Sequence, residues 1–417
     1  MAGPIQPRTT GPSVGRPGLR RCISVPPEEF ATQYWAQRPL LSPGSGGFGD
    51  LFSLAAVDEL LSGRGLRTPF LRVAKDGKVV DPSCFTGSGG AGAEIADQVA
   101  DDKVMRLLVD GATVVLQALH RTWPPLVEFA QQLTDDLGHP VQVNAYVTPP
   151  QSQGFAAHYD VHDVFVLQIA GVKRWLIHPP VLEHPLRTQP WQDRAAAVAA
   201  GAAEAPVIDT VLRPGDALYL PRGWLHSAEA LGDTSVHLTV GAHPVTRHSL
   251  VEALAELAAD LPALRESLPL GVDVSDPTQV ASQLSVVVDA LSEWLSHAEP
   301  AAVAGRLRDR TWPQWRPEPV APLAQAAAVG QLDADSVVRL RRHLPHTLFQ
   351  AADGGVVLRL TDRTLTLPAV TEAAVKTLLS GAPVRVGEVP GLDPADQVVL
   401  VRRLLREAIC VPVSEAQ

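Results

Sequence analysis

Residues 141–244 consist largely of short runs in which apolar and polar residues alternate, separated by turns that contain Gly or Pro. Such alternation is typical of β-strands, because successive side chains of a strand point to opposite faces of the sheet. Strands in quick succession without helices between them favour an antiparallel barrel or a double-sheet jelly roll. The strand-forming segments that we expect are 141–149, 157–171, 173–180, 207–230 and 235–244.

The segments before this region predict a mixture of helices and strands. Apolar residues at helical spacing, with a Pro at the start or a Gly at the end, indicate helices over 55–66 and 124–138. A short helix that leads into an extended segment fits 27–41. Residues 68–80 are strand-like around the turn signal Asp76-Gly77, and 111–120 is a further strand.

After residue 245 the pattern becomes helical. Residues 249–268 and 280–298 carry apolar side chains three and four positions apart, and 311–322 is a Pro-rich linker. We then expect a helix over 333–344, a strand pair over 356–368 and two more helices. Helices combined with a strand pair over about 85 residues resemble a winged-helix module, which has the size of a small domain.

These patterns predict a protein that is mainly β with added helices, in four parts. Residues 1–27, rich in Pro, Gly and Arg, are expected to form a disordered tail. The β-rich domain covers 28–244, a helical region with its linker covers 245–322, and a winged-helix-like domain covers 323–417.

Composition narrows the classes of function for this 417-residue chain. The net charge of −10 argues against general nucleic-acid binding, so DNA binding by the last domain is not expected despite the arginines in 338–344 and 401–407. Three scattered cysteines exclude a disulfide scaffold and a Cys-rich zinc site, and they suit a reducing cytoplasm. No apolar run approaches the roughly 20 residues of a membrane span, so we expect a cytoplasmic protein without membrane contacts.

The segment 154–165, GFAAHYDVHDVF, holds the candidate metal ligands. His158, Asp160 and His162 lie two residues apart, so a strand would direct all three to one face. An iron(II) oxygenase site needs two His and one carboxylate. His158 and His162 would be about 13 Å apart on a strand, too far for one ion to use both. His226, in a second strand-rich segment, is the best remaining ligand, although it could also be a hydrogen-bonded core histidine.

Two longer stretches resemble a known family. They are NAYVTPPQSQGFAAHYDVHDVFVLQIAGVKRW (144–175) and GDALYLPRGWLHSAEA (215–230), the second followed by SVHLTVG. Both are similar to the JmjC-type cupin oxygenases that depend on 2-oxoglutarate, in the ribosomal-oxygenase branch. The resemblance implies a double-stranded β-helix (cupin or jelly-roll) JmjC domain, a helical dimerisation segment and a C-terminal winged helix.

The resemblance also implies roles for individual residues. His158, Asp160 and His226 match the ligands of Fe(II), which leaves His162 as a hydrogen-bonded neighbour. Lys173 matches the lysine that binds the far carboxylate of 2-oxoglutarate, and we place it just after a hairpin formed by 168–172.

Three further positions concern the cosubstrate 2-oxoglutarate. Asn144 and Tyr146 match residues that line its pocket. Arg174, on the opposite strand face from Lys173, is the second choice for the carboxylate. Gly241 stands where relatives carry Ser or Thr, so a hydroxyl group that contacts the cosubstrate region is absent here.

The expected activity is therefore that of an Fe(II)- and 2-oxoglutarate-dependent dioxygenase that uses O2. It would hydroxylate an Arg or His side chain of a ribosomal protein and release succinate and CO2. Alternatives are lysine demethylation, or a non-oxygenase metal cupin that acts as a ligand sensor or isomerase. A sensor would keep the three metal ligands but would have no need of Lys173, Asn144 and Tyr146.

The resemblance also implies a homodimer. Helix 249–268 carries an apolar stripe that includes Leu254, and helix 280–298 carries one that includes Leu291. The matching segment of the family pairs with its copy in a second subunit, and such a twofold interface buries the same patch on both chains.

Overall fold

The computed structural model of the chain describes residues 15–75, 77–152 and 155–413. Two compact units meet between Pro244 and Val245. This boundary lies where the alternating pattern gives way to the helical pattern. Each unit has its own hydrophobic core, and the two are described separately below.

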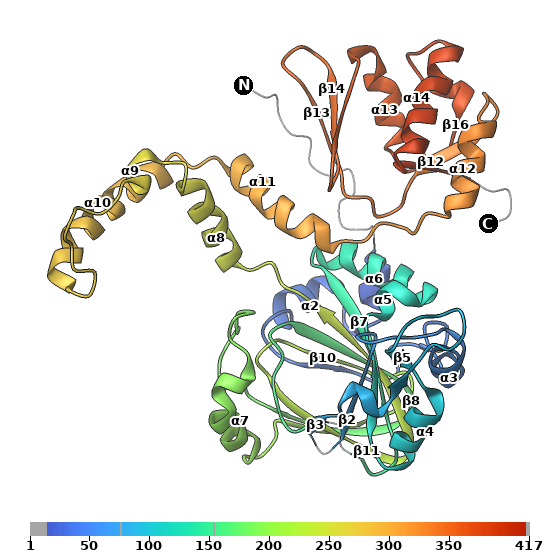
Figure 1. Cartoon of the computed structure of the whole chain (residues 1–417), viewed down its shortest axis with the longest axis vertical. Helices are drawn as coiled ribbons and strands as arrows, with labels where there is room; N and C mark the ends of the chain where they lie inside the picture. Colours follow the sequence, from blue (N-terminus) through green and yellow to red (C-terminus); the bar gives the residue numbers. More distant parts are fainter. Residues whose placement is uncertain (1–14, 76, 153–154, 414–417) are drawn as a thin grey trace. The chain divides into compact units, whose positions relative to one another are not determined.

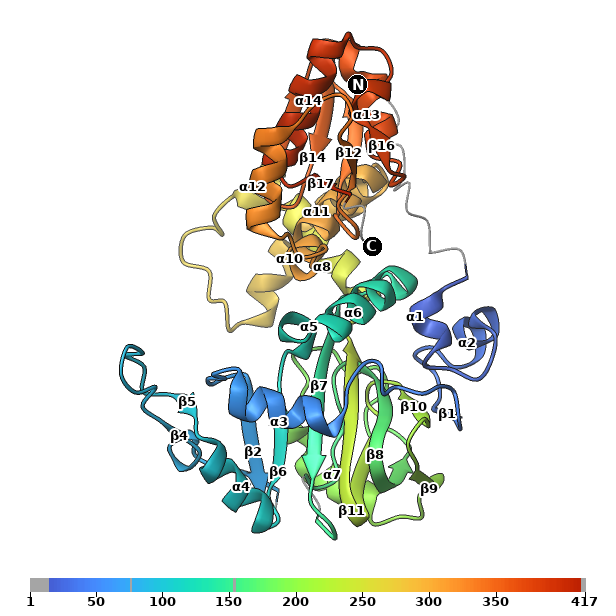
Figure 2. The same cartoon turned by 90° about the vertical axis from the view of Figure 1, so that its right-hand side faces the viewer.

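The first unit is built on one antiparallel sheet, which is visible in Figures 1 and 2. Its strands are β1 (Leu40–Ser42), β2 (Leu71–Lys75), β3 (Lys78–Val79), β6 (Thr113–Leu116), β7 (Val141–Thr148), β8 (Asp163–His178), β9 (Ile208–Leu212), β10 (Ala217–Leu220) and β11 (Leu225–Ala242). They follow the order β1-β10-β8-β11-β7-β6-β2-β3, and β9 also pairs with β8. A separate two-stranded sheet joins β4 (Thr86–Gly87) to β5 (Gln98–Val99).

The two longest strands, β8 and β11, pair with each other along most of their length. The first half of β8 also pairs with β10, and its second half pairs with β9. The hairpin expected at 168–172 is therefore wrong, because the strand continues through it. Gly171 adopts a φ of 63°, and the register between β8 and β11 shifts opposite it. An irregularity of this kind bends a strand without reversing the chain.

Alternation along the strands separates the hydrophobic core from a polar cavity. On β7, Val143, Ala145 and Val147 are buried in the main core, while Asn144 and Tyr146 point to the other face. The core side is covered by α6 (Pro124–Leu137), which begins at a proline and ends at a left-handed Gly138.

The disordered tail expected over 1–27 is wrong for its second part. Helix α1 (Pro17–Arg20) packs on α6, and the side chains of Leu19 and Cys22 are buried. The backbone N–H of Leu19 donates to Asp136 Oδ2 at 2.9 Å. These two buried side chains attach the Pro- and Gly-rich segment to α6. Residues 1–14 lie outside the described residues.

Other short helices complete this unit. They are α2 (Pro27–Gln33), α3 (Leu54–Gly63), α4 (Asp101–Val109), α5 (Leu119–Thr122) and α7 (Ala195–Ala202). Helix α3 begins at Ser53, whose side chain accepts from the N–H of Ala56, as the helix predicted near 55–66 requires.

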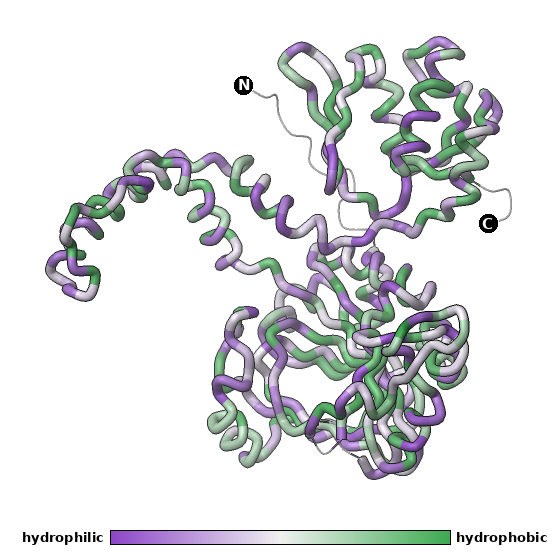
Figure 3. Tube along the Cα trace, viewed as in Figure 1, coloured by the Kyte–Doolittle hydropathy of each residue, from purple (hydrophilic) through white to green (hydrophobic). Residues whose placement is uncertain are grey.

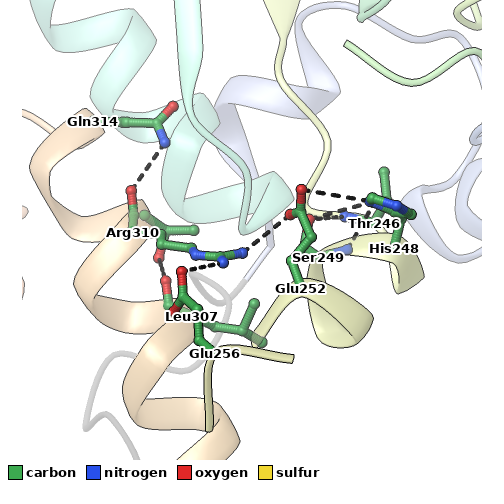
Figure 4. Close-up of polar contacts among 9 residues, drawn as sticks. Thr246, His248, Ser249, Glu252, Glu256, Leu307, Arg310 and Gln314 are labelled. Carbon is green, nitrogen blue, oxygen red and sulfur yellow. Dashed lines mark hydrogen bonds and ion pairs between the residues drawn. The ribbon is translucent and has the colours of Figure 1, made fainter. Parts of the chain in front are cut away.

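The helical region begins the second unit with α8 (Arg247–Ala258), α9 (Pro262–Arg265), α10 (Pro277–Leu295) and α11 (Pro300–Thr311). Figure 4 shows Arg310 of α11 between Glu252 and Glu256 of α8, and Arg310 forms ion pairs with both. The start of α8 is capped by Thr246 and Ser249. Helix α10 mixes apolar and polar residues along its length (Figure 3), and none of its 19 residues is buried.

The C-terminal domain holds two three-stranded sheets, β16-β12-β17 and β13-β14-β15, with a core of its own. Its elements are α12 (Pro322–Gln331), β12 (Val337–Leu340), β13 (Thr347–Gln350), β14 (Val356–Arg359), β15 (Thr364–Leu367), α13 (Glu372–Leu378), β16 (Val384–Arg385), α14 (Pro394–Arg406) and β17 (Cys410–Pro412).

The helix predicted over 333–344 is wrong, because this segment forms β12. Val338 and Leu340 alternate into the core, and their β-strand neighbours supply the backbone hydrogen bonds. Three helices with a β-hairpin are compatible with a winged helix, which stays a prediction. Among the described residues, no helix combines the length and apolar character that crossing a bilayer requires.

Candidate metal centre and cosubstrate cavity

The polar face of the sheet lines a cavity with an empty volume of about 540 Å³. Its wall is formed by residues of β6, β7, β8 and β11 and by the loop before β8. The loop contributes His158 and Asp160, and the start of β11 contributes His226. One ligand atom of each lies within 4.8 Å of the others, so the three side chains can hold a single metal ion.

The loop that carries His158 and Asp160 is not a regular strand, contrary to the expectation for 157–171. Strand β8 begins at Asp163, after bends at Val161 and His162. His158 instead pairs with His226 through an isolated bridge. The N–H of His226 donates to the His158 carbonyl at 2.8 Å, and the N–H of His158 donates to the His226 carbonyl at 3.2 Å. The backbone therefore positions two of the three side chains.

The second ring nitrogen of each histidine is also occupied. His158 Nδ1 lies 2.8 Å from the carbonyl oxygen of Ala156, and His226 Nδ1 lies 3.1 Å from that of Trp224. A carbonyl accepts only, so each Nδ1 carries the proton and each Nε2 is left with a lone pair. This arrangement orients an imidazole for metal binding. His226 Nε2 lies 3.7 Å from Asp160 Oδ2.

The surroundings of these groups favour the protonation states that a metal needs. Burial and, to a smaller extent, the charge of neighbouring His158 lower the pKa of His226 to about 4, so the imidazole is neutral near pH 7. Burial alone would raise the pKa of Asp160, but the charges of the nearby histidines and Arg72 lower it below its ordinary value. Two neutral imidazoles and one carboxylate form a donor set for a divalent transition metal.

Lys173 lies in the same cavity, with 3% of its surface exposed. Its Nζ donates to Thr148 Oγ1 at 3.0 Å, and burial lowers its pKa to about 7. A buried cation that meets a neutral hydroxyl is suited to receive an anionic group. Arg174 points to the outer face, where it pairs with Asp209 in a bidentate ion pair.

The other candidates are placed differently. Tyr146 lines the cavity and stacks on His237, whereas Asn144 is outside its lining and its Oδ1 accepts from the N–H of Ala118. A cosubstrate contact by Asn144 stays a prediction. His162 neighbours the triad but does not belong to it; its ring lies 5.0 Å from that of His243, and its Nε2 lies 3.3 Å from Gln142 Nε2.

Gly241 also lies outside the cavity lining. A Cβ atom at this position would approach Gln142 and His162 at 3.2 Å. The lining residue of this part of β11 is Thr239, two positions earlier, which supplies a hydroxyl group of its own. The absence of a hydroxyl at Gly241 therefore removes no group from the cavity wall.

Sequence reasoning missed His237 and Phe155, which both line the cavity. His237 is buried, and its pKa is held well below the ordinary value by burial and by the charge of Lys173. The sequence pattern could have indicated it. His237 stands two residues before Thr239, on the same strand face, and its neighbours on the opposite face are apolar. Phe155 stands before the metal loop and lies edge-on to His158 and Tyr146.

Residues 123–250, which hold all of these side chains except Thr113 and Arg72, match the family model described as JmjC domain. The chain contains a JmjC domain. Two curated relatives match a longer part of the chain, 58% of it in each case. The chain is 31% identical over 264 residues to the bifunctional lysine-specific demethylase and histidyl-hydroxylase NO66 of Drosophila persimilis, which covers 58% of this chain and 35% of the relative.

The second relative is ribosomal oxygenase 1 of Gallus gallus, 35% identical over 251 residues, with 58% of this chain and 39% of the relative covered. The chain thus spans well under half the length of either relative.

Solved structures of Escherichia coli ribosomal oxygenase YcfD have a similar fold. One matches with a TM-score of 0.53 at 18% identity and covers 94% of this chain and 99% of its own. Another, titled as a complex with cobalt and 2-oxoglutarate, matches with a TM-score of 0.51 at 16% identity. These likenesses confirm the predicted cupin-type fold of the JmjC domain.

Proposed function

We propose that this protein is an Fe(II)- and 2-oxoglutarate-dependent oxygenase that hydroxylates a side chain of a protein substrate. The observation that carries the proposal is the convergence of His158, Asp160 and His226 with buried Lys173 in one cavity. The reaction would use O2 and 2-oxoglutarate and would yield succinate, CO2 and the hydroxylated side chain.

The residues of the site fit a bound metal ion. The Nε2 atoms of His158 and His226 and a carboxylate oxygen of Asp160 would hold it on one side, and the cavity leaves the other side accessible. When bound, the metal supplies activation of dioxygen. The carbonyl contacts of both Nδ1 atoms keep the rings oriented, and the low pKa of His226 removes competition by protons.

Lys173 would bind the carboxylate of 2-oxoglutarate that is remote from the metal. Its ammonium group is buried in the same cavity, and Thr148 Oγ1 accepts a hydrogen bond from it. A charge-assisted hydrogen bond in such surroundings is stronger than a neutral one. Tyr146 and His237 form a stacked wall along the cavity.

The relatives support a protein substrate. Two of them are named ribosomal oxygenase or histidyl-hydroxylase, and one of the similar YcfD structures is a complex with cobalt and 2-oxoglutarate. An Arg or His side chain of a ribosomal protein is therefore our proposed target. The net charge of −10 suits a basic partner of this kind.

Lysine demethylation is the second candidate, since the name of the Drosophila relative includes this activity. It would use the same metal and cosubstrate and would hydroxylate an N-methyl group instead of a side-chain carbon. A sensor or isomerase would have no need of the buried cation Lys173.

Replacement of single ligands tests the proposed metal centre. Asp160→Ala and His158→Ala should lose Fe(II) or Mn(II) binding and all 2-oxoglutarate turnover, because two side chains hold a metal ion far more weakly than three. His162→Ala is the matched control, since this histidine neighbours the triad but lies outside it. An Asp160→Ala protein that consumes 2-oxoglutarate at the wild-type rate would contradict the assignment.

We also propose that the protein is a homodimer through its helical region. Helix α10 has no buried residue, and Leu284, Val288 and Leu295, which lie on one side of it, are 56%, 50% and 46% exposed. Apolar side chains on such a helix favour burial against a second surface. A second copy of the chain would cover the same face on both subunits.

A further inference from the structure

Arg72 belongs to a row of residues that crosses four neighbouring strands. Arg72 of β2 is opposite Val115 of β6, Val115 is opposite Tyr146 of β7, and Tyr146 is opposite His237 of β11. Directly paired residues of antiparallel strands point to the same face of the sheet. Because Tyr146 and His237 line the cavity, Arg72 also points to the cavity side.

The side chain between Arg72 and Tyr146 is short. The Cα atoms of Arg72 and Tyr146 are separated by two strand spacings, about 10 Å, which an arginine side chain can largely cross. Val115 is fully buried and does not fill this space as a long side chain would. The guanidinium of Arg72 can therefore extend over Val115 toward Tyr146.

The contacts of Arg72 place its charge beside the candidate metal centre. The guanidinium carbon lies 5.2 Å from the ring centroid of Phe155, the same ring that lies edge-on to His158. The guanidinium also interacts with the hydroxyl of Tyr146, and this contact partly opposes the burial that raises the pKa of Tyr146 to about 12. Within the described part of the chain, the buried Nε of Arg72 has no hydrogen-bond partner.

The charge balance of the cavity makes this guanidinium important for what can enter. In the loaded site that we propose, the charges of a divalent metal, a 2-oxoglutarate dianion, Asp160 and Lys173 cancel. Arg72 then leaves a net positive charge beside Phe155 and Tyr146, which line the cavity. A second cation brought against it would be repelled in surroundings that screen charge poorly.

The donor properties of Arg72 point in the same direction. A guanidinium donates hydrogen bonds and accepts none, and the buried Nε–H of Arg72 is not used by a described residue. A side chain with a lone pair, such as a neutral imidazole or a carboxamide, can accept from it. Arginine and methylated lysine side chains have no acceptor and carry a positive charge.

We propose that Arg72 is a specificity-determining residue that admits a neutral, hydrogen-bond-accepting side chain of the protein substrate and rejects guanidinium and methyl-ammonium groups. This inference rests on the proposed function and narrows its substrate class. It favours an imidazole or carboxamide target over arginine, and hydroxylation over lysine demethylation.

Binding of defined peptide libraries tests the role of Arg72. In each library one central residue is fixed as His, Asn, Gln, Arg or trimethyl-lysine and the flanking positions are randomised. Binding is measured on full-length protein loaded with Mn(II) and 2-oxoglutarate in the absence of oxygen. We expect the wild type to bind the His, Asn and Gln libraries at least ten-fold more tightly than the Arg and trimethyl-lysine libraries. The carboxamides show that a preference for His does not come from ligation of the metal.

Variants of Arg72 provide the decisive comparison. Arg72→Gln should reduce the preference at least ten-fold, Arg72→Glu should reverse it toward cationic residues, and Arg72→Lys should still reject cations. Arg174→Gln, which removes an arginine from the outer face of β8, should leave the preference unchanged. Metal and 2-oxoglutarate affinity, measured by calorimetry, should be retained in all variants and confirms that each has folded.

Two results would overturn the inference. One is a wild-type protein with no preference or with a preference for cationic libraries. The other is an Arg72→Gln protein that keeps the wild-type preference. A wild-type protein that binds neither Mn(II) nor 2-oxoglutarate would instead refute the proposed function, so the two failures are distinguishable.

Discussion

Lys173 shows how the position of one residue sets the chemistry of this cavity. Its Nζ is buried beside Thr148, and burial lowers its pKa to about 7, whereas Arg174 next to it lies on the surface in an ion pair with Asp209. Alternation along β8 is responsible for this difference. Neighbouring cations in the sequence thus have separate roles in the molecule.

The contact between Lys173 and the cosubstrate can be tested directly. Lys173→Ala should weaken 2-oxoglutarate binding by roughly 10- to 100-fold, since a hydrogen bond to a charged group contributes about 1.5–3 kcal/mol. Metal content should not change, because Lys173 is not a ligand. Calorimetry with 2-oxoglutarate checks the affinity, and Arg174→Ala is the matched control. Equal affinity of wild type and Lys173→Ala would favour a non-oxygenase cupin.

The pKa of Lys173 also predicts a pH dependence. Only the protonated ammonium attracts a carboxylate, so the affinity for 2-oxoglutarate should fall as the pH rises above about 7. This slope should be absent from Lys173→Ala. The free energy of unfolding should change in the opposite direction. Between pH 7 and about 10.4, Lys173 is protonated in the unfolded chain but not in the unliganded folded chain, so the free energy of unfolding should increase as the pH rises. Titration calorimetry between pH 6 and 9 measures the first effect.

At the residue scale, spacing alone could predict part of the site. The spacing of His158 and Asp160 and the need for a distant third ligand led to His226, and the resemblance added Lys173 and Tyr146. Asn144 shares a strand face with Tyr146, but the sequence could not show that a backbone N–H of another segment meets its side chain. The approach of Arg72 depends on strand pairing between β2 and β6, which no local pattern reveals.

At the scale of elements, the long strands β8 and β11 connect the two sides of the cavity. Each continues past a point where the sequence predicted a break, because Gly171 and the shift in register opposite it bend the pair without ending it. The alternating pattern predicted the strands but not their continuity. The same pattern was decisive in β12, where two β-branched residues form a strand in a segment expected to be helical.

A substitution at Gly171 tests the importance of this bend. Gly171→Ala should destabilise the protein by about 1–3 kcal/mol, since the residue has a positive φ and an added Cβ would overlap the backbone of Thr234. Gly232 has a similar φ of 73° but nothing within 4 Å of its Cβ position, which makes Gly232→Ala the control for conformational strain alone. Urea unfolding of both variants measures the difference. Equal destabilisation would show that the contact with Thr234 does not matter.

At the scale of the whole molecule, the exposed helix α10 bears on how the chain assembles. Its 19 residues form regular helix although none of them is buried in the single chain. In proteins most helical stability comes from packing of an apolar face rather than from intrinsic propensity. The exposed apolar residues of α10 therefore fit the partner surface that we propose.

Charge placed on α10 should disrupt the proposed dimer. Leu284 and Leu295 are 56% and 46% exposed in the single chain, so Leu284→Glu with Leu295→Glu should not disturb the fold of one subunit. We expect the wild type to have twice the chain mass of 44.4 kDa in light scattering and the double variant to approach 44.4 kDa. Ser282→Glu, on the opposite side of α10, should remain dimeric. A wild-type mass of one chain at micromolar concentration would refute the dimer.

The backbone bridge between His158 and His226 has a consequence for how the metal centre can be followed in solution. Each N–H donates to the carbonyl of the other residue, so the loop and the start of β11 are joined by backbone hydrogen bonds that do not involve the metal-binding side chains. Hydrogen–deuterium exchange at these two amides should therefore stay slow after the protein is stripped by a chelator. Fast exchange in the stripped protein would show that the ion itself closes the bridge. The exchange rates of the His158 and His226 amide protons can thus distinguish loss of the ion from unfolding of the loop that carries the ligands.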